Sequence, residues 1–214
     1  MFRPEQKGYD RVVESRQNAP VGRPRGFDAD AALEKAMLVF WSRGYDGVSL
    51  SDLARAMGIT KTSLYAAFGN KDELFQKALV RYAEGPAAYA VTALDEPTSR
   101  DVATAYLTGA VRTCTWPGGP AGCMSTQAFT AAANLENPLR AALDDWRVAN
   151  RARLRDRFQH AVDAGDLPEG TDTDLLARYL MATADGLAVQ ASAGATREEL
   201  QQLADAAVRN WPPA

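Results

Sequence analysis

The sequence predicts an all-α protein, with a small N-terminal unit of three helices and a larger C-terminal helical domain, about nine helices in all. Apolar residues recur at the three- and four-residue spacing of a helix from residue 28 almost to the end of the chain. Capping residues, glycines and prolines interrupt that pattern where helices would begin and end. No run alternates apolar and polar residues as a β-strand would. These three observations favour packed helices over any sheet architecture.

Charge is unevenly distributed along the 214 residues. The chain has a formal net charge of −3, but residues 1–82 carry a surplus of three positive charges and residues 83–214 a surplus of six negative charges. A basic front on an acidic body indicates a polyanion as the partner of the front.

Bulk composition excludes several classes of protein. The two cysteines, Cys114 and Cys123, are too few for a disulfide framework in a chain of this size. No apolar run approaches the ~18 residues of a membrane span. The first residues also lack the apolar core of a signal peptide. We therefore expect a cytoplasmic protein with reduced thiols and no membrane partner.

Three segments differ in composition. Residues 1–26 are polar, contain several prolines and glycines, and hold the whole positive surplus of the front, so they predict a flexible basic arm. Residues 27–83 predict a compact helical unit, and residues 84–214 predict a second, larger helical domain.

Capping signals divide the segment 27–83 into helices. Asp28 or Asp30 can cap a first helix that ends at Gly44, and its apolar stripe comprises Leu33, Ala36, Met37, Phe40 and Trp41. Ser49 caps a second helix, which Gly58 ends. A third helix begins at Thr60 and ends near residue 68, and a fourth, capped by Asn70, covers about residues 71–83.

The outward side of the third helix is unusual. It presents hydroxyl groups and a single cation without any acid: Thr60, Lys61, Thr62, Ser63 and Tyr65. Two short helices joined at a glycine and packed on a longer one form a helix-turn-helix unit, whose second helix must enter a major groove about 12 Å wide. Small polar groups and a lysine can reach base edges or phosphates there. We therefore predict that this helix reads duplex DNA.

The segment from Gly22 to about Tyr82 resembles the DNA-binding domain of the tetracycline-repressor (TetR) family. The resemblance depends on Gly44-Tyr45 and on the run VSLSDLARAMGITKTSLYAAFGNKDELF, residues 48–75. That run includes the junction between the third and fourth helices, which a generic helix-turn-helix match would not. The sequence departs from the family pattern at Ala66 and Ala67, where many members carry an aromatic residue or histidine.

The resemblance implies a DNA-contacting role for each matching position. Ser49 and Leu50 would place the start of the second helix against a phosphate, since free N–H groups there favour an anion. Thr60, Lys61, Thr62 and Ser63 would lie in the groove, Tyr65 and Lys71 would hold phosphates, and Arg23 and Arg25 would reach the flanking backbone or the minor groove. Purely structural roles are the alternative to DNA contact, because Thr60 can serve as a cap alone and Tyr65 can pack on its own domain.

The C-terminal half resembles the family only in its layout, as a ligand-binding and dimerisation domain. The last two helices, at 172–193 and 196–211, have wide apolar faces with small residues that permit close helix approach. The resemblance implies a homodimer through these helices and a palindromic DNA operator that matches its two-fold symmetry. The alternative is that these faces pack only within one chain.

A small-molecule effector is the second implied partner, and no cofactor or metal is expected. Candidate pocket residues on the central helices are Tyr106, Trp116, Met124, Phe129, Trp146 and Met181. Few charges fall on those inward faces, so we expect a largely apolar or aromatic effector. By resemblance, its binding tilts the helix at 71–83 and separates the two reading helices, which releases the operator.

Two alternatives stand beside a ligand-responsive repressor. Cys123 follows a glycine loop at a helix start, where the helix dipole lowers a thiol pKa, so it could sense electrophiles or oxidants. The helix-turn-helix could instead serve an adaptor that binds protein. An enzyme is not supported, because the sequence lacks a phosphate-binding glycine loop and the common hydrolase and zinc-protease motifs.

Overall fold

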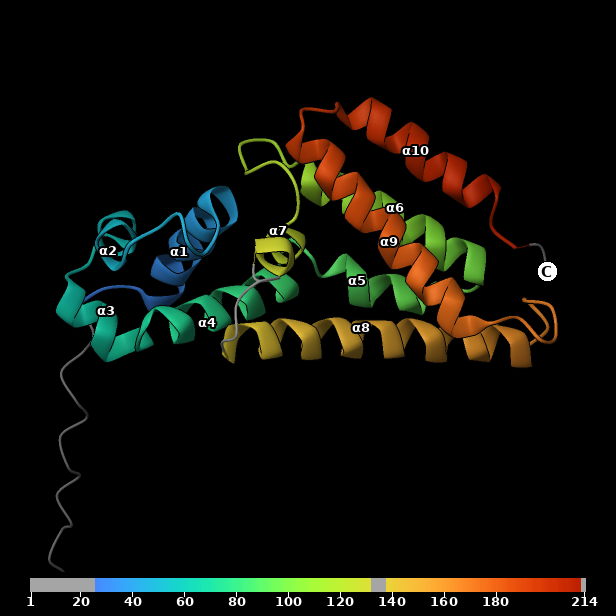
Figure 1. Cartoon of the computed structure of the whole chain (residues 1–214), viewed down its shortest axis with the longest axis horizontal. Coiled ribbons are helices and arrows are strands. Elements are labelled where there is room, and N and C mark those ends of the chain that lie inside the picture. The colour runs from blue at the N-terminus through green and yellow to red at the C-terminus, as the bar shows by residue number, and fades with distance from the viewer. Residues whose placement is uncertain (1–25, 132–137, 213–214) are drawn as a thin grey trace, which may run out of the picture.

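The computed structural model describes the backbone of residues 26–131 and 138–212, and these residues form helices without a strand (Figure 1). The elements are α1 (Ala29–Arg43), α2 (Leu50–Met57), α3 (Lys61–Phe68), α4 (Lys71–Glu84), α5 (Tyr89–Thr92), the 3₁₀ helix η1 (Ala93–Asp95), α6 (Ser99–Cys114), α7 (Met124–Ala131), α8 (Pro138–Asp163), α9 (Thr173–Ser192) and α10 (Arg197–Arg209). The all-α prediction is confirmed. The sequence did not predict α5 and η1, because four and three residues are too short to show a helical period.

Side-chain caps define the helices of the N-terminal unit. Of the two aspartates considered for α1, Asp28 is the cap, since its carboxylate accepts from the N–H groups of residues 30 and 31 at 3.0 and 3.1 Å. Ser49 and Asn70 form capping boxes with the third residue of α2 and α4, and Thr60 Oγ1 accepts from the N–H of Ser63 at 3.1 Å. Gly58 has a left-handed φ of 73°, which permits the tight turn between α2 and α3.

A close-packed aromatic core holds α3 and α4 against α1. Phe40 of α1 meets Phe75 of α4 edge to face, with ring centroids 4.9 Å apart. Leu53 and Leu64, from α2 and α3, are fully buried in the same core. Burial of each such side chain contributes about 1.5–3 kcal/mol, so α3 is fixed on a rigid support.

The C-terminal domain is arranged around α9, which packs against α8, α6 and α10. Figure 1 shows α9 crossing in front of α6, with α8 along the lower edge of the molecule and α10 above. Arg157 of α8 donates to the carbonyl oxygens of Leu94, Glu96 and Pro97 at 2.7–3.0 Å, which fastens the segment around η1 to α8. The two halves of the chain meet where α1 and α4 pack against α7 and where α4 packs against α8.

Two hydrogen bonds join the halves where the loop 115–123 reaches α7. The indole N–H of Trp41, in α1, donates to the carbonyl oxygen of Gly122 at 3.1 Å. The hydroxyl of Tyr82, in α4, donates to Cys123 Sγ at 3.3 Å. The Trp41 and Tyr82 rings also pack edge to face at 4.9 Å, so α1 and α4 share one contact with the C-terminal domain.

Candidate nucleic-acid interface and effector site

The outward face of α3 is exposed and free of acid. Lys61, Thr62 and Tyr65 are exposed, whereas Leu64 and Phe68 fix the opposite side of the helix in the core. Lys61 takes part in no ion pair with the described residues. No acidic residue occurs anywhere from residue 53 to residue 71. The face can therefore approach a polyanion without like-charge repulsion.

Thr60 and Ser63 are partly committed to the helix itself. Besides the cap, their hydroxyl oxygens lie 2.9 Å apart and share a hydrogen bond. Ser63 is half-buried. Of the four residues predicted to lie in the groove, Lys61 and Thr62 thus have side chains open to a partner, as does Tyr65, which was predicted to hold a phosphate.

The start of α2 already holds a negative group. Asp52 Oδ2 accepts from the Ser49 N–H at 3.1 Å and from the Ser49 hydroxyl at 2.6 Å. These hydrogen bonds from Ser49 lower the pKa of Asp52 below its usual value. The predicted phosphate contact here would depend on the N–H groups of Leu50 and Ser51, since the next two N–H groups donate to the Ser49 hydroxyl and carbonyl oxygens.

Lys71 lies at the start of α4, next to the reading helix. Its ammonium stands 4.2 Å from the centre of the Tyr45 ring, and the Tyr45 hydroxyl donates to Asp72. Burial and this carboxylate raise the pKa of Tyr45, so the hydroxyl remains a donor. Lys71 is half-buried and held in place rather than fully solvated.

The base of the N-terminal arm lies beside α3. Gly26 and Phe27 line a hollow of about 380 Å³ together with Thr60, Ser63 and the two alanines that depart from the family pattern, Ala66 and Ala67. Phe27 packs against Phe68, with ring centroids 6.3 Å apart. The arm itself, with the predicted contacts of Arg23 and Arg25, lies outside the described residues.

Three of the six predicted pocket residues come together. Tyr106, Trp146 and Met181 line a small enclosed cavity of about 30 Å³ between α6, α8 and α9. Trp116 lies apart, in a cleft of about 590 Å³ with Arg81 and Arg112. The remaining two are also elsewhere: Met124 is fully buried in the core, and Phe129 is held between the guanidinium groups of Arg140 and Arg147 at 4.6 and 4.4 Å.

The enclosed cavity is more polar than the sequence indicates. Arg147 and Asp185 form an ion pair at 2.7 Å on its wall, and Asn150 donates to the Tyr106 hydroxyl at 3.0 Å. Burial raises the pKa of Tyr106 to about 12, so this hydroxyl stays protonated. The expectation of few charges at this location is wrong. Arg147 and Asn150 lie on α8, a helix with many charged residues. No local sequence pattern shows which of its polar residues face the cavity.

Comparison with known proteins places both halves of the chain. The model of bacterial regulatory proteins of the tetR family matches residues 32–78, and the model of the tetracyclin repressor-like C-terminal domain matches residues 101–207. The chain belongs to the TetR family. The resemblance seen in residues 48–75 is thereby confirmed and extends to the C-terminal domain, where the sequence indicated only a similar layout.

Individual relatives agree with this assignment. The TetR-family chain is 34% identical to the HTH-type transcriptional repressor ComR of Escherichia coli (strain K12), over 89% of this chain and 92% of that protein. A structure of the TetR-family regulator CifR, a cysteine mutant complexed with 26-bp operator DNA, matches with a TM-score of 0.81 and 38% identity over 89% of this chain and all of that chain. AibR, in complex with isovaleryl coenzyme A and operator DNA, shares the fold alone, at 22% identity and a TM-score of 0.62 over 86% of this chain and 98% of that chain.

The chain is accordingly a ligand-responsive, DNA-binding transcriptional regulator of the TetR type and not an enzyme. These findings do not favour the adaptor or the thiol sensor. Within the described residues, no helix is long and apolar enough to cross a membrane.

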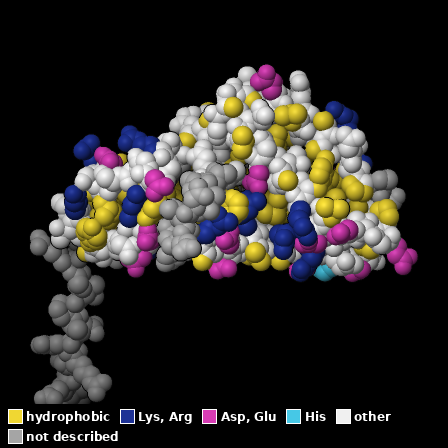
Figure 2. All heavy atoms as spheres, viewed as in Figure 1, with side chains coloured by type: hydrophobic (Ala, Val, Ile, Leu, Met, Phe, Trp, Pro, Cys, Tyr) yellow, Lys and Arg dark blue, Asp and Glu magenta, His cyan; other side chains and the backbone are white. Residues whose placement is uncertain are grey.

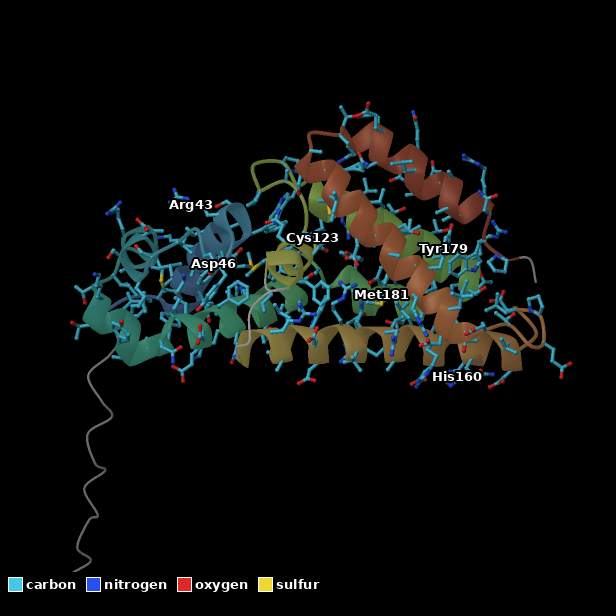
Figure 3. All side chains as sticks on the ribbon, viewed as in Figure 1. Arg43, Asp46, Cys123, His160, Tyr179 and Met181 are labelled. Atoms are coloured by element: carbon cyan, nitrogen blue, oxygen red, sulfur yellow. The ribbon has the colours of Figure 1, made fainter. Side chains whose placement is uncertain are left out.

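The face of the TetR-type C-terminal domain that α9 and α10 form is apolar and exposed. Figure 2 shows hydrophobic side chains gathered over these helices. The large exposed side chains are Leu175, Tyr179 and Val189 on α9 and Leu203 on α10. Tyr179 lies on a different side of α9 from Met181, which lines the enclosed cavity (Figure 3). Tyr179 packs against Trp211, with ring centroids 6.4 Å apart, yet it and the other three side chains stay 43–60% exposed.

Cys123 lies at the start of α7, between the two halves of the molecule (Figure 3). Only 8% of it is exposed, and its sulfur also lies 3.1 Å from the Ser125 hydroxyl. The loop before α7 folds back toward Cys114, because the Gly122 N–H donates to the Cys114 carbonyl oxygen at 3.0 Å. Both cysteines are nevertheless free thiols. Burial raises the pKa of Cys114, which keeps that thiol protonated and unreactive. The environment of Cys123 therefore suits a structural contact with Tyr82 better than a reactive thiolate.

Proposed function

We propose that the protein is a cytoplasmic repressor that binds a palindromic operator as a homodimer and releases it when a small, largely apolar effector binds. Residues 27–83 form the DNA-binding domain, with α3 in the major groove. Residues 84–214 form the effector-binding and dimerisation domain, and the basic arm, residues 1–26, adds contacts to the flanking DNA.

The observation that carries the DNA-reading role is the exposed face of α3. Lys61, Thr62 and Tyr65 project from a short helix whose other side is fixed in an aromatic core. Fixed donors lose little freedom when they meet base edges, so rigid support favours specific reading. CifR, 38% identical, has been seen on operator DNA, which supports the same partner here.

Dimerisation would follow from the apolar face of α9 and α10. The spacing along α9 places three exposed apolar side chains on one side of the helix: Leu175, Tyr179 four residues later, and Val189 ten residues after that. The exposed Gly186 on the same helix has open space around it, so a partner helix could approach closely there. A two-fold axis along this face would present two α3 helices to the two halves of a palindrome.

Selection of duplexes from a random pool by the purified chain tests the proposal. We expect a palindrome, and then a gel-shift titration of variants on that operator. Thr62→Ala should alter base preference at one position of each half-site, an effect of about 1–3 kcal/mol for a lost base contact. Lys71→Ala should weaken binding to all sequences alike and reduce the dependence on salt.

Arg155→Ala is the matched control, because this exposed cation of α8 lies far from α3. It should leave both affinity and preference unchanged. If the selected pool shows no palindrome, or if both α3-side variants bind as the native chain does, the proposed reading helix is wrong.

A further inference from the structure

A hollow beside the reading helix is not used by any of the DNA contacts named so far. It has a volume of about 380 Å³ and lies between α3, the turn before it and the two residues that precede the cap of α1. Four of the residues that line it are apolar: Phe27, Ile59, Ala66 and Ala67. Figure 1 shows α3 at the end of the molecule away from the C-terminal domain, where a duplex can reach it.

The hollow stays open because the side chains of α3 are short at this place. Ala66 is exposed and Ala67 is half-buried, and each side chain ends at its Cβ atom. Phe27 is held behind them by its contact with Phe68, with ring centroids 6.3 Å apart. Phe27 and Ile59 are themselves only half-buried, so apolar surface stays in contact with water. A group that covered this surface would gain free energy by leaving water.

The lining of the hollow is poor in groups that could read a polar base edge. No charged residue is found among the described residues that line it. Its two hydroxyls, of Thr60 and Ser63, share a hydrogen bond at 2.9 Å, and the Thr60 hydroxyl also accepts from the Ser63 N–H. The hollow therefore offers no cation to a phosphate and few free donors or acceptors to a base. An apolar group suits it better.

The hollow opens on the side of α3 that is expected to enter the major groove. Ala66 follows Thr62 by four residues and Ser63 by three, so these three side chains are neighbours on one face of the helix. A base edge that meets Thr62 would therefore have Ala66 beside it. Among the groups that base pairs present in the major groove, the 5-methyl group of thymine is the apolar one, and the others are hydrogen-bond donors and acceptors.

We propose that Ala66 and the hollow beside it receive the 5-methyl group of a thymine, one in each half of the operator. The inference rests on the proposed function and adds a specificity-determining residue to it. The methyl group would lie against Ala66 and turn away from water toward Phe27 and Ile59. A pyrimidine without this methyl group leaves the hollow unfilled, so the site selects thymine without forming a hydrogen bond.

Replacement of thymidine by deoxyuridine in the selected operator tests the proposal. Deoxyuridine pairs with adenine as thymidine does and differs only by the missing methyl group. Each thymidine is replaced in turn, symmetrically in both half-sites, and fluorescence anisotropy measures the affinity of the full chain. We expect one position at which the replacement weakens binding about tenfold or more, because each methyl group removed from water contributes a factor of about four.

Ala66→Ser shows whether that methyl group lies in the hollow. Serine is close to alanine in size but places a hydroxyl against the methyl group, so the preference for thymidine over deoxyuridine should fall to about threefold or less. Ala56→Ser is the matched control, because Ala56 is an exposed alanine of α2 that does not line the hollow. It should leave the preference at its native value. Circular dichroism establishes that both variants are folded.

Operator binding separates failure of this inference from failure of the proposed function. If the native chain retains no duplex from the random pool, the proposed function fails and the thymine site with it. If it retains a palindrome but no thymidine is sensitive to replacement, only the thymine site is overturned. The same holds if Ala66→Ser and Ala56→Ser have equal effects at the sensitive position. A preference that Ala66→Ser alone reduces supports the site.

Discussion

The two halves of this TetR-family chain carry function in different ways. In the N-terminal unit, the residues expected to enter the groove, Thr60 to Ser63, are consecutive, and their placement follows from one short helix and its cap. In the C-terminal domain, the polar groups of the enclosed cavity are brought together from distant positions: Tyr106 meets Asn150 across 44 residues, and Arg147 meets Asp185 across 38.

That difference teaches what a local pattern can reveal. A helix that reads DNA needs one exposed face and one turn before it, and a short run of consecutive residues determines both. A pocket needs three or four helices to pack in one relative orientation, and that orientation is decided by the whole core. The predictions below test this contrast, starting with the largest expected effect.

Loss of the proposed dimer should have the largest effect, because the two reading helices would no longer be held at a fixed separation and orientation. Val189→Glu would place a carboxylate on the exposed apolar face of α9, and two-fold symmetry would bury it twice. An unpaired buried charge costs about 3–5 kcal/mol, so the dimer dissociation constant should rise a thousandfold or more. Sedimentation velocity would show monomers, and operator binding at nanomolar protein would disappear.

Val80→Glu is the control for that experiment, since Val80 of α4 and Val189 are nearly equally exposed, at 56% and 55%. It should remain dimeric. A dimeric Val189→Glu protein would show that the α9 and α10 face is not the interface and would remove the basis for a palindromic operator.

A charge reversal on α3 should come next in size. Lys61→Glu introduces an acid into a stretch, residues 53–71, that contains none, and the dimer would carry two such acids. We expect operator affinity to fall by about a hundredfold or more at low salt, because each lost cation contact is joined by repulsion from the phosphates. Fluorescence anisotropy at several salt concentrations measures this loss, which should shrink as salt rises. Arg155→Glu, the same reversal on α8, should change affinity little; a similar loss would point to overall charge rather than to this face.

The sequence predicted much of the fold and part of the site. The caps at Ser49, Thr60 and Asn70 were predictable because each depends on a side chain and an N–H group three residues apart. The same reasoning missed that Asp52 occupies the start of α2, although a Ser-x-x-Asp spacing could have indicated it. Trp116, Met124 and Phe129 lie apart from the cavity that the other three candidates line, because the spacing of a residue along a helix does not show which neighbour it will face.

Replacing a tyrosine by phenylalanine, once within the N-terminal unit and once at the junction with the C-terminal domain, compares the stability of the two regions. The Tyr45 hydroxyl donates to a carboxylate within the N-terminal unit, and the Tyr82 hydroxyl donates to a thiol across the junction. A hydrogen bond to a charged group contributes about 1.5–3 kcal/mol and one to a neutral group about 0.5–1.5 kcal/mol. Tyr45→Phe should therefore lower the free energy of unfolding by about 1.5 kcal/mol, since the pair is only partly buried, and Tyr82→Phe by about 0.5 kcal/mol. Urea denaturation measures both losses. A larger loss for Tyr82→Phe would mean that the hydrogen bond across the junction contributes more to stability than the one within the N-terminal unit, contrary to this expectation.

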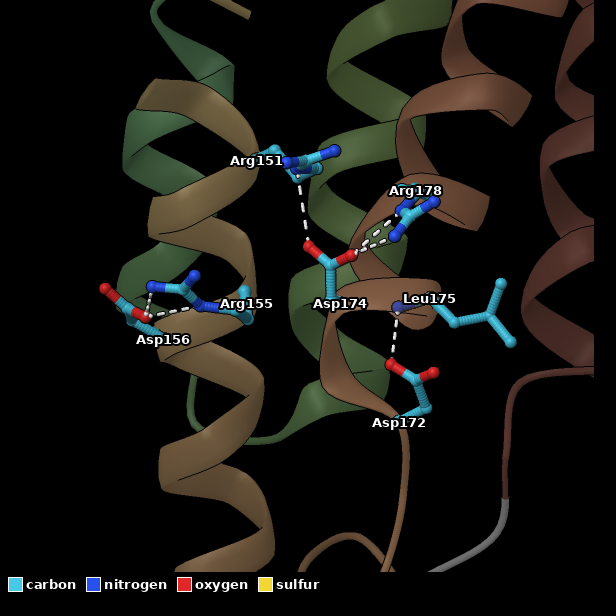
Figure 4. A network of polar contacts seen from close by, with 7 residues as sticks. All are labelled: Arg151, Arg155, Asp156, Asp172, Asp174, Leu175 and Arg178. Carbon is cyan, nitrogen blue, oxygen red and sulfur yellow. Dashed lines mark hydrogen bonds and ion pairs between the residues drawn. The ribbon is translucent and has the colours of Figure 1, made fainter. Parts of the chain in front are cut away.

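The smallest effect concerns the pH dependence of stability, and one carboxylate from each half of the chain is compared. Hydrogen bonds from Arg178 lower the pKa of Asp174, which also pairs with Arg151 at 3.3 Å (Figure 4), and hydrogen bonds from Ser49 lower the pKa of Asp52.

Because each folded pKa lies below the ordinary value near 3.8, each carboxylate stabilises the fold above that value and loses this contribution as pH falls through the folded pKa. Asp174→Asn and Asp52→Asn should therefore be less stable than the native chain at pH 7, by a difference that stays constant down to about pH 5 and narrows below pH 4. Both carboxylates are in contact with solvent, at 34% and 29% side-chain exposure, so solvent screening keeps the differences small. Urea denaturation at pH 7, 5 and 3.5 would measure them. A difference that widened on acidification would mean that these carboxylates destabilise the folded chain, contrary to the hydrogen bonds that each accepts.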